Sequence, residues 1–310
     1  MINLYILLSF LAFSNHKKVE DKVIEHGKIR IEVKANVGAR LNQLYFDNIP
    51  LLVSDKEQEE YYGSTWWPSP QRDWHWPPPK SIDEGAYHYK QSATSAKMTS
   101  SPLKTSDLRL TKGIEIINDH KVRFTYEAEN IGKENKTFGH WEITRLAKGG
   151  RVIFPAGSAF GDAEFATFPG LLYFKKDKNT EKLINPSVDC FDIPIKKGCG
   201  TIPHTDKTKL LADGQDGWAA YLNDGILLVK SFENTEIDRL APTQGEVELF
   251  VNPDLDFIEL EEHGAYQTVA PEQTSTWTVD WYMYKYPSNM PQDAASIKAF
   301  VEKNIKVNNL

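Results

Sequence analysis

The sequence has few cysteines, no basic cluster and no apolar segment long enough for an ordinary membrane span. Its 310 residues include only two cysteines, Cys190 and Cys199. They either pair across the short loop 191–198 or remain free thiols, and two thiols alone do not make a metal site. Acidic residues outnumber basic ones, 43 to 36, which gives a net charge of −7. Because nucleic-acid affinity rests on clustered Lys and Arg, this composition argues against a nucleic-acid partner.

Several catalytic motifs are also missing. The chain has no Gly-x-Ser-x-Gly elbow, no glycine-rich phosphate loop and no zinc-binding spacing of His and Cys. Serine–histidine hydrolysis, nucleotide chemistry and metalloprotease chemistry therefore lack support. The sequence predicts no cofactor and no metal.

The N-terminus carries one short apolar run, residues 2–13, which is interrupted only by Asn3 and Ser9. It is too short for a ~20-residue membrane span. Small residues at Ala12 and Ser14 and a polar segment after them favour a secretory signal peptide over residues 1–14. The alternative is a buried first strand or helix. We expect a periplasmic or secreted protein without stable membrane insertion after removal of the signal.

Alternation of apolar and polar residues dominates the rest of the chain and predicts an all-β fold. In residues 28–34, Ile29, Ile31 and Val33 alternate with charged side chains, as expected for a half-buried antiparallel strand. Helical spacing of apolar residues occurs only near the C-terminus, after a cap at Asp293, and predicts a helix within residues 291–307. Further alternating segments lie at 122–126, 246–250, 257–261 and 277–281. The absence of repeats or linkers favours one large β-sandwich domain.

Residues 66–79 hold four of the eight tryptophans together with five prolines. Proline fixes its own φ and donates no ladder hydrogen bond, so we expect a stiff loop and not a central strand. Indole faces pack against the C–H faces of sugar rings, and the polar residues between them could bond hydroxyls or a carboxylate. The alternative is a rigid plug with buried tryptophans. The candidate binding residues here are Trp67, Gln71, Arg72, Trp74, His75 and Trp76.

A second candidate feature is the pair Glu259 and Glu261. Alternation places both on one face of a strand, ~7 Å apart, with Ile258 and Leu260 on the other face. Two carboxylates on one sheet face can serve as a base and a hydroxyl acceptor in a cleft. The alternative is an ordinary solvated strand face.

Two further strands carry candidates. His140, Glu142 and Thr144 share one strand face, and a His beside a carboxylate can donate a proton near neutral pH. The alternative is a surface His–Glu pair. Lys230 lies in a strand with apolar residues on both faces, where it is either a snorkelling edge residue or a cation directed into a pocket. Arg72 and Lys230 are compatible with an acidic sugar.

These motifs resemble a known family. Residues 67–71 read Trp-Pro-Ser-Pro-Gln and residues 74–78 read Trp-His-Trp-Pro-Pro. This pattern resembles the hallmark of a domain family of unknown function in the galactose-mutarotase-like superfamily. Three further stretches, 130–144, 217–232 and 259–281, fit that family in the same order, so the resemblance covers about residues 28–286.

The resemblance implies a β-supersandwich of two large antiparallel sheets over residues 20–287, with a mono- or oligosaccharide bound on a concave sheet face. In characterised mutarotases, a Glu takes the anomeric hydroxyl proton and a His protonates the ring oxygen. By position, Glu259 or Glu261 would be the base, and His140 the acid, with His75 as a substitute.

Two elements of the mutarotase signature are absent from this sequence. An Asn-His-x-x-Phe-Asn-type stretch does not occur, and the usual Pro-Gly pair after the Glu strand is missing; residues 270–273 read Ala-Pro-Glu-Gln. The same fold hosts several activities. The alternatives to an aldose-1-epimerase-like enzyme are therefore a non-catalytic carbohydrate-binding protein and a polysaccharide lyase or hydrolase.

Overall fold

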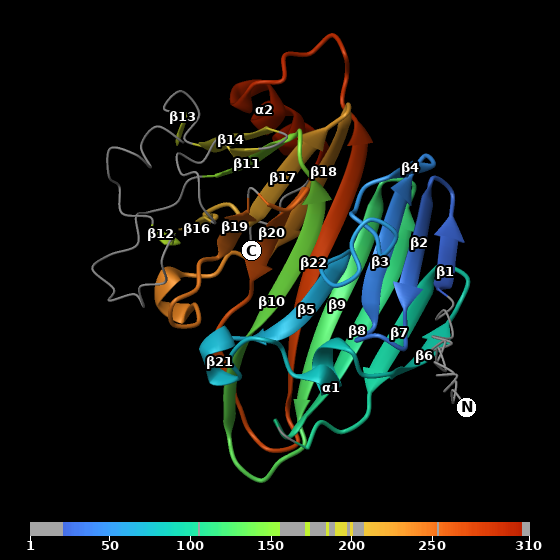
Figure 1. The fold of residues 1–310 in the computed structure, drawn as a ribbon, viewed down its shortest axis with the longest axis vertical. Coiled ribbons are helices and arrows are strands. Elements are labelled where there is room, and N and C mark those ends of the chain that lie inside the picture. Colours follow the sequence, from blue (N-terminus) through green and yellow to red (C-terminus); the bar gives the residue numbers. More distant parts are fainter. Residues whose placement is uncertain are drawn as a thin grey trace, which may run out of the picture.

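Two large, stacked β-sheets form the body of the protein (Figure 1). The computed structural model describes residues 21–104, 106–155, 208–252 and 254–305, and the backbone of short strands between residues 171 and 200. The predicted signal peptide, residues 1–14, lies outside the described residues, as do the side chains of Cys190 and Cys199. The predicted β-sandwich is confirmed. No helix in the described part of the chain is long and apolar enough to cross a bilayer.

The first sheet has the strand order β1-β2-β3-β5-β10-β20-β19-β16-β12, with β4 beside β3 and β21 beside β10. Pairing is antiparallel throughout, except that β12 and β16 are parallel. Its strands are β1 (Lys22–His26), β2 (Ile29–Lys34), β3 (Arg40–Phe46), β4 (Ile49–Pro50), β5 (Ser64–Ser69), β10 (Lys136–Ala147), β12 (Leu171–Tyr173), β16 (Thr208–Ala212), β19 (Val247–Val251), β20 (Phe257–His263) and β21 (Gln267–Val269).

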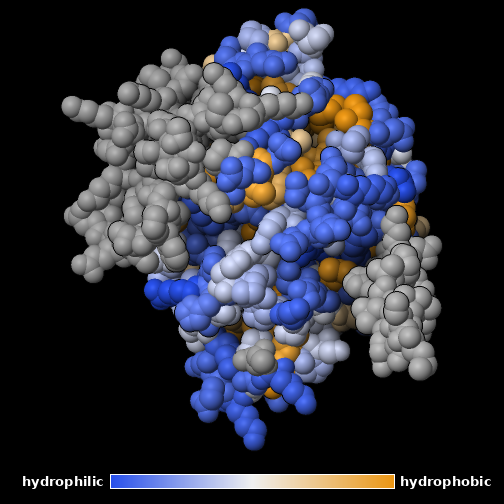
Figure 2. Space-filling model, in the orientation of Figure 1, coloured by the Kyte–Doolittle hydropathy of each residue, from blue (hydrophilic) through white to orange (hydrophobic). Residues whose placement is uncertain are grey.

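The second sheet has the order β13-β14-β11-β17-β18-β22-β9-β8-β7-β6, with β15 beside β14. Figure 2 shows a mainly hydrophilic surface on the displayed face, with hydrophobic residues in separate groups. The strands of this sheet are β6 (Tyr87–Gln91), β7 (Ser95–Ser100), β8 (Leu108–Asn118), β9 (Lys121–Asn130), β11 (Arg151–Pro155), β13 (Ile184–Asn185), β14 (Cys190–Lys196), β15 (Cys199–Gly200), β17 (Trp218–Asn223), β18 (Ile226–Phe232) and β22 (Thr274–Lys285).

The predicted C-terminal helix is present as α2 (Ala294–Asn304). Asp293 caps it, because its carboxylate accepts a hydrogen bond from the Ser296 amide at 2.8 Å. Ile297 and Val301 are completely buried against apolar side chains of β17 and β18. The helix therefore covers the outer face of the second sheet at one end of the molecule (Figure 1).

The tryptophan–proline segment is only partly the loop that we expected. Its first residues, through Ser69, belong to β5, which pairs with β10. The prediction of a loop is wrong there because residues 66–69 pair with β10. On its other side, β5 pairs with β3 only at Ser64. Beyond Ser64 one edge of the strand is open, and a proline such as Pro68 is tolerated at an unpaired edge. The short helices η1 (Gln71–Asp73) and α1 (Lys80–Asp83) follow.

A cluster of charged residues lies buried between the sheets. Lys230 is completely buried and forms ion pairs with Glu142, at 2.8 Å, and with Glu262. Lys230 also donates to the Thr144 hydroxyl at 2.8 Å, and Glu142 accepts a hydrogen bond from the Trp281 indole at 3.0 Å. Burial raises the pKa of Glu262 to about 7, although Lys230 opposes this shift. Lys230 and Glu142 therefore connect the two sheets and are not surface residues.

Replacing Lys230 with Met should destabilise the protein strongly. The substitution leaves Glu142 and Glu262 in the core without their cation, and breaking a buried ion pair costs ~3–5 kcal/mol. Urea unfolding measures the change. Lys97→Met is the matched control, because the ion pair of Lys97 with Glu127 lies on the surface and is worth ~0–1 kcal/mol. Equal unfolding midpoints for the two variants would contradict this account of the core.

Candidate functional site

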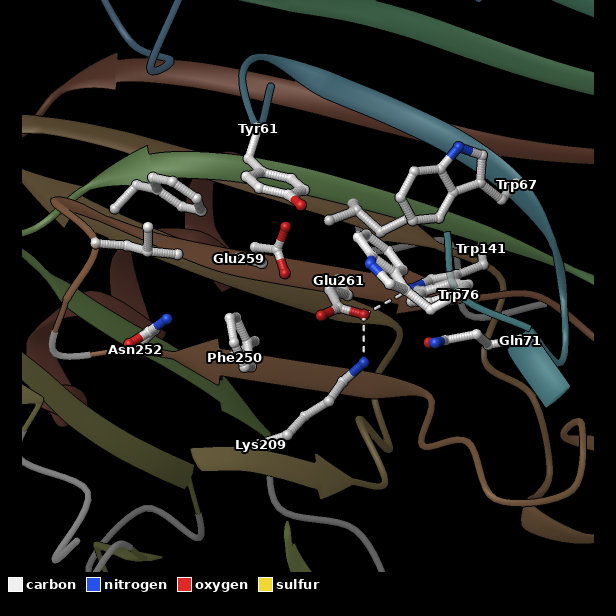
Figure 3. A pocket seen from close by; sticks show the side chains of 13 residues that line it. Tyr61, Trp67, Gln71, Trp76, Trp141, Lys209, Phe250, Asn252, Glu259 and Glu261 are labelled. Atoms are coloured by element: carbon white, nitrogen blue, oxygen red, sulfur yellow. Dashed lines mark hydrogen bonds and ion pairs between the residues drawn. The ribbon is translucent and has the colours of Figure 1, made fainter. Parts of the chain in front are cut away.

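A pocket of about 420 Å³ lies on the face of the first sheet that points away from the second sheet. This volume is typical of small-molecule sites. Strands β10, β20, β19 and β16 supply its floor, and Tyr61 and Trp76 reach it from the segments before and after β5 (Figure 3). The lining residues are Tyr61, Trp67, Gln71, Trp76, Trp141, Ile143, Lys209, Phe250, Asn252, Leu255, Phe257, Glu259 and Glu261.

Strand register assembles this floor from segments that are far apart in sequence. Ile143 on β10 lies opposite Glu261 on β20, and Phe250 on β19 lies opposite Glu259. Residues that lie directly opposite each other in an antiparallel pair project to the same face. Alternation along β20 directs Ile258 and Leu260 into the core, where both are completely buried. The predicted common face of Glu259 and Glu261 is therefore the pocket face.

Aromatic rings form one side of the pocket (Figure 3). Trp67 and Trp141 lie opposite each other on β5 and β10, with ring centroids 5.4 Å apart and nearly perpendicular planes. Trp76 packs edge-on against Trp67 at 6.1 Å and stacks on Tyr61 at 6.0 Å. Trp74 lies outside the lining, stacked on Trp141 at 6.3 Å, and its indole donates to the Pro68 carbonyl at 2.9 Å. The four indoles form one packed unit, so the wall is rigid.

Glu259 reaches the pocket from the middle of β20. Its side chain is 17% exposed and forms a 3.0 Å ion pair with Arg145, whose side chain is buried. Arg145 also donates to the Thr65 hydroxyl at 3.1 Å. The buried guanidinium therefore holds the Glu259 carboxylate in place while part of that carboxylate stays accessible.

Glu261 is almost fully buried at the base of the pocket. Its Oε2 accepts hydrogen bonds from the Trp141 indole at 2.7 Å and from Lys209 at 2.8 Å. Lys209 also forms a 2.5 Å ion pair with Glu248. Burial raises the pKa of Glu261 to about 8; Lys209 opposes this shift and the Glu248 carboxylate adds to it. Burial alone would raise the pKa of Glu248, but Lys209 and His263 outweigh it and lower this pKa to about 2.

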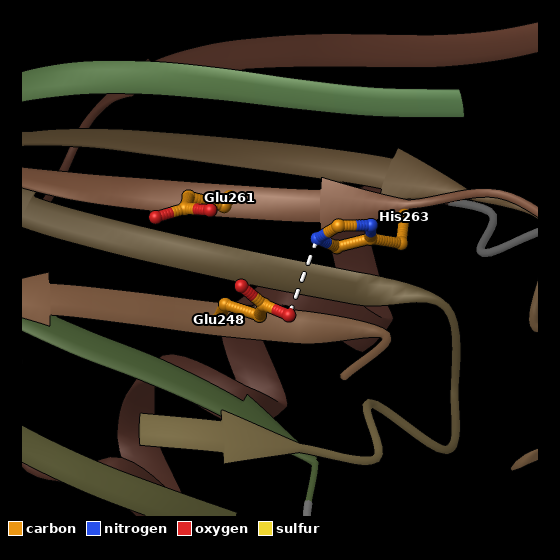
Figure 4. Close-up of side chains that lie close together, drawn as sticks. All are labelled: Glu248, Glu261 and His263. Atoms are coloured by element: carbon orange, nitrogen blue, oxygen red, sulfur yellow. Dashed lines mark ion pairs between the residues drawn. The ribbon is translucent and has the colours of Figure 1, made fainter. Parts of the chain in front are cut away.

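Glu248, Glu261 and His263 form a compact cluster next to the pocket (Figure 4). Their donor atoms lie within 4.8 Å of one another, and Nε2 of His263 is 3.4 Å from Glu248. One imidazole and two carboxylates suit Zn²⁺ or a similar divalent ion. In this structure Lys209 pairs with both carboxylates, so the chain supplies a positive charge of its own there. The ring of His263 also stacks on Trp141 at 5.3 Å, which supports the pocket wall from behind.

Comparison with known proteins identifies the family. A family model described as a domain of unknown function (DUF4380) matches residues 28–284. This protein belongs to the DUF4380 family. No curated protein matches its sequence significantly.

The DUF4380 domain shares its fold with solved galactose mutarotase-like structures. A galactose mutarotase-like protein from Lactobacillus casei is 10% identical with a TM-score of 0.56, over 85% of this chain and 100% of its own. A galactose mutarotase related enzyme from Lactobacillus acidophilus is 8% identical with a TM-score of 0.59, over 86% and 98%. The Slr1438 protein from Synechocystis sp. PCC 6803 is 10% identical with a TM-score of 0.59, over 92% and 100%. At such low identity these matches show the fold alone.

The pocket of the DUF4380 domain includes part of the candidate set from the sequence. Trp67, Gln71, Trp76, Glu259 and Glu261 line it. The other residues of the tryptophan–proline segment do not. Trp74 packs behind the wall, as described above, whereas Arg72 and His75 are exposed outside the lining. The guanidinium of Arg72 has only a loose contact, at 3.7 Å, with the carboxylate of its neighbour Asp73.

The structure places His140, Glu142 and Lys230 in the core, on the opposite side of the first sheet from the pocket. His140 is 1% exposed, stacks between Trp66 and Trp277, and forms a 2.7 Å hydrogen bond with Ser275. Burial lowers the pKa of His140 to about 3, so it is neutral at pH 7. The expected common face of His140 and Glu142 is correct, but that face is the interior. The hypothesis of a proton donor at His140 is therefore not supported by its position.

Sequence reasoning missed several residues of the site. Glu248 and Phe250 share a face in the alternating segment 246–250. Pairing this segment with residues 257–261 would have placed both of them beside Glu259 and Glu261. Trp141 and Arg145 lie on the opposite face of β10 from His140 and Glu142, and the sequence pattern yields no candidate on that face. Lys209 has no motif around it, because only the pairing of β16 with β19 brings it to the pocket.

The raised pKa of Glu261 predicts a pH-dependent effect of Glu261→Gln on stability. The folded state binds a proton at Glu261 up to about pH 8, whereas the unfolded chain releases it near pH 4.5. Stability contributed by this group is therefore lost as pH rises from about 4.5 to 8. Glutamine removes that loss, so the variant should gain stability relative to the parent by at least ~1 kcal/mol between pH 5 and pH 8.5. Urea unfolding at the two pH values tests this, and a pH-independent difference would contradict it.

Proposed function

We propose that the protein binds a sugar in this pocket and interconverts its anomers, as an aldose-1-epimerase-like enzyme. The observation that carries the proposal is the position of Glu259 and Glu261, which project side by side from β20 into an aromatic-lined cavity. Indole faces such as those of Trp67 and Trp141 suit the C–H faces of a sugar ring. The amides of Gln71 and Asn252 suit its hydroxyls.

Anomer exchange needs one group that accepts a proton and one that donates it. A base takes the proton of the anomeric hydroxyl while an acid protonates the ring oxygen; the bond between C1 and the ring oxygen breaks, C1 rotates, and the reverse steps close the ring. Glu259 is the proposed base, because Arg145 holds its carboxylate in place and part of that carboxylate stays accessible from the pocket. Glu261, which retains its proton at neutral pH, is the proposed acid in place of His140.

The fold is consistent with an aldose-1-epimerase-like activity, but the proposal rests on the pocket residues. Proteins described as galactose mutarotase-like share the two-sheet architecture. Together with the predicted signal peptide, this leads us to propose a periplasmic or secreted protein that acts on sugars outside the cytoplasm.

Non-catalytic sugar binding is the second candidate. One observation favours it: both pocket carboxylates already have partners. Glu259 pairs with Arg145, and Glu261 accepts hydrogen bonds from Trp141 and Lys209. Carboxylates held in this way can accept hydrogen bonds from sugar hydroxyls without transferring protons. A lyase or hydrolase on the same fold would instead release unsaturated uronates or new reducing ends from an added polysaccharide.

Glu259→Gln and Glu261→Gln should each slow anomer exchange, since a general acid or base contributes ~10²–10⁴-fold. NMR on freshly dissolved α-anomers of several hexoses and uronic acids measures the rate. Glu127→Gln, on the surface of the other sheet, is the matched control and should retain the parent rate. If no sugar equilibrates faster than in buffer but saturable binding persists, the epimerase proposal fails and the binding protein stands.

A further inference from the structure

Trp76 is the only exposed residue among the eight tryptophans, all of which lie in the described part of the chain. Its exposed fraction is 51%, whereas Trp67 and Trp141 in the same wall are 4% and 3% exposed. A single exposed apolar residue on a protein surface needs no explanation. Trp76 differs because it lines the mouth of the candidate site.

The exposed indole of Trp76 is held rigidly. It stacks on Tyr61 and packs against Trp67, and residues 77–79 are three successive prolines, which restrict the chain after it. A surface that is fixed before binding loses little conformational entropy when a ligand covers it. Trp76 therefore offers a preformed apolar platform.

The platform and the carboxylates lie at different depths. Glu261 is 1% exposed at the base of the pocket, whereas Trp76 lies at its open side. Figure 3 shows Glu259 and Glu261 in the centre, with Trp76 and Gln71 together on one side. A single sugar ring at the carboxylates would leave the outer part of Trp76 uncovered, so the shape of the site favours a ligand with at least two rings.

The charges near the pocket favour an uncharged ligand. Lys209, the only lysine or arginine in the described lining, pairs with Glu248 and Glu261. Arg145, behind the lining, pairs with Glu259. Neither cation is available to an anionic sugar without breaking an ion pair, and the nearby carboxylates would repel it. Lys230, which by sequence is compatible with an acidic sugar, lies in the core and does not line the pocket.

We propose that the ligand is an uncharged oligosaccharide whose reducing-end ring lies at Glu259 and Glu261 and whose next ring stacks on Trp76. This inference rests on the proposed function, because anomer exchange takes place only at a reducing end. The inference specifies the size and charge of the substrate, and it assigns Trp76 a role in selecting longer saccharides.

The experiment compares saccharides of different length on the full protein. Glucose, galactose, mannose and xylose are titrated by calorimetry beside reducing di- and trisaccharides built from each. We expect at least one disaccharide to bind about 10-fold more tightly than its monosaccharide. Trp76→Ala should weaken disaccharide binding by a larger factor than monosaccharide binding and so reduce that advantage, whereas Trp76→Tyr should preserve most of it. Ile117→Ala, at an exposed apolar residue of the other sheet, should change neither affinity.

Two results would overturn the inference while anomer exchange survives: equal affinity for mono- and disaccharides, or equal weakening of both by Trp76→Ala. A disaccharide with a uronic acid at its reducing end should bind at least 10-fold more weakly than its uncharged counterpart, and equal affinity would overturn the assignment of charge. If no saccharide binds or equilibrates, the proposed function fails as well, so the two failures are distinguishable.

Discussion

The pairing of β10 with β20 is the constraint on which both the core and the pocket depend. With Ile143 opposite Glu261, Glu259 and Glu261 face the pocket, and Glu142 and Glu262 face the second sheet. A shift of one residue would exchange the two faces of either strand. The correct register is enforced from both sides, because Lys230 requires the inner carboxylates and Lys209 requires Glu261.

The adjacent residues Glu261 and Glu262 on β20 are both buried beside a lysine, but they lie on opposite faces of the first sheet. Glu262 is buried beside Lys230, which is tied to Glu142 as well, and the cluster has no access to a ligand. Glu261 is buried beside Lys209, which is tied to Glu248 as well, and this cluster borders the pocket. In both cases two carboxylates share one ammonium group, which favours retention of a proton by one of them. The inner cluster stabilises the sandwich, and the outer one holds a carboxyl group at the base of the pocket.

Period-two alternation was sufficient to predict the fold class and the residues that share a strand face. It assigned Glu259 and Glu261 to one face, and His140 and Glu142 to one face, both correctly. It could not determine which of these faces points inward, because a buried ionic cluster and a solvated face have the same polar pattern. Glu142 forms an ion pair with Lys230 and accepts a hydrogen bond from the Trp281 indole. These partners lie ~90 and ~140 positions away along a chain whose strand neighbours are set by tertiary pairing.

The tryptophan–proline segment places buried core residues and pocket-lining residues within one short stretch. Trp66 is buried in the core, Trp67 next to it faces the pocket, and Trp76 lies exposed at the mouth, so exposure rises along the segment. Composition predicts aromatic contacts with a ligand but gives Trp67, Trp74 and Trp76 the same weight. The distinction comes from strand alternation at Trp66 and Trp67 and from the prolines that follow Trp76. Because Trp74 and His263 pack on Trp141 from outside the lining, the wall that a sugar would meet is supported by residues that do not touch it.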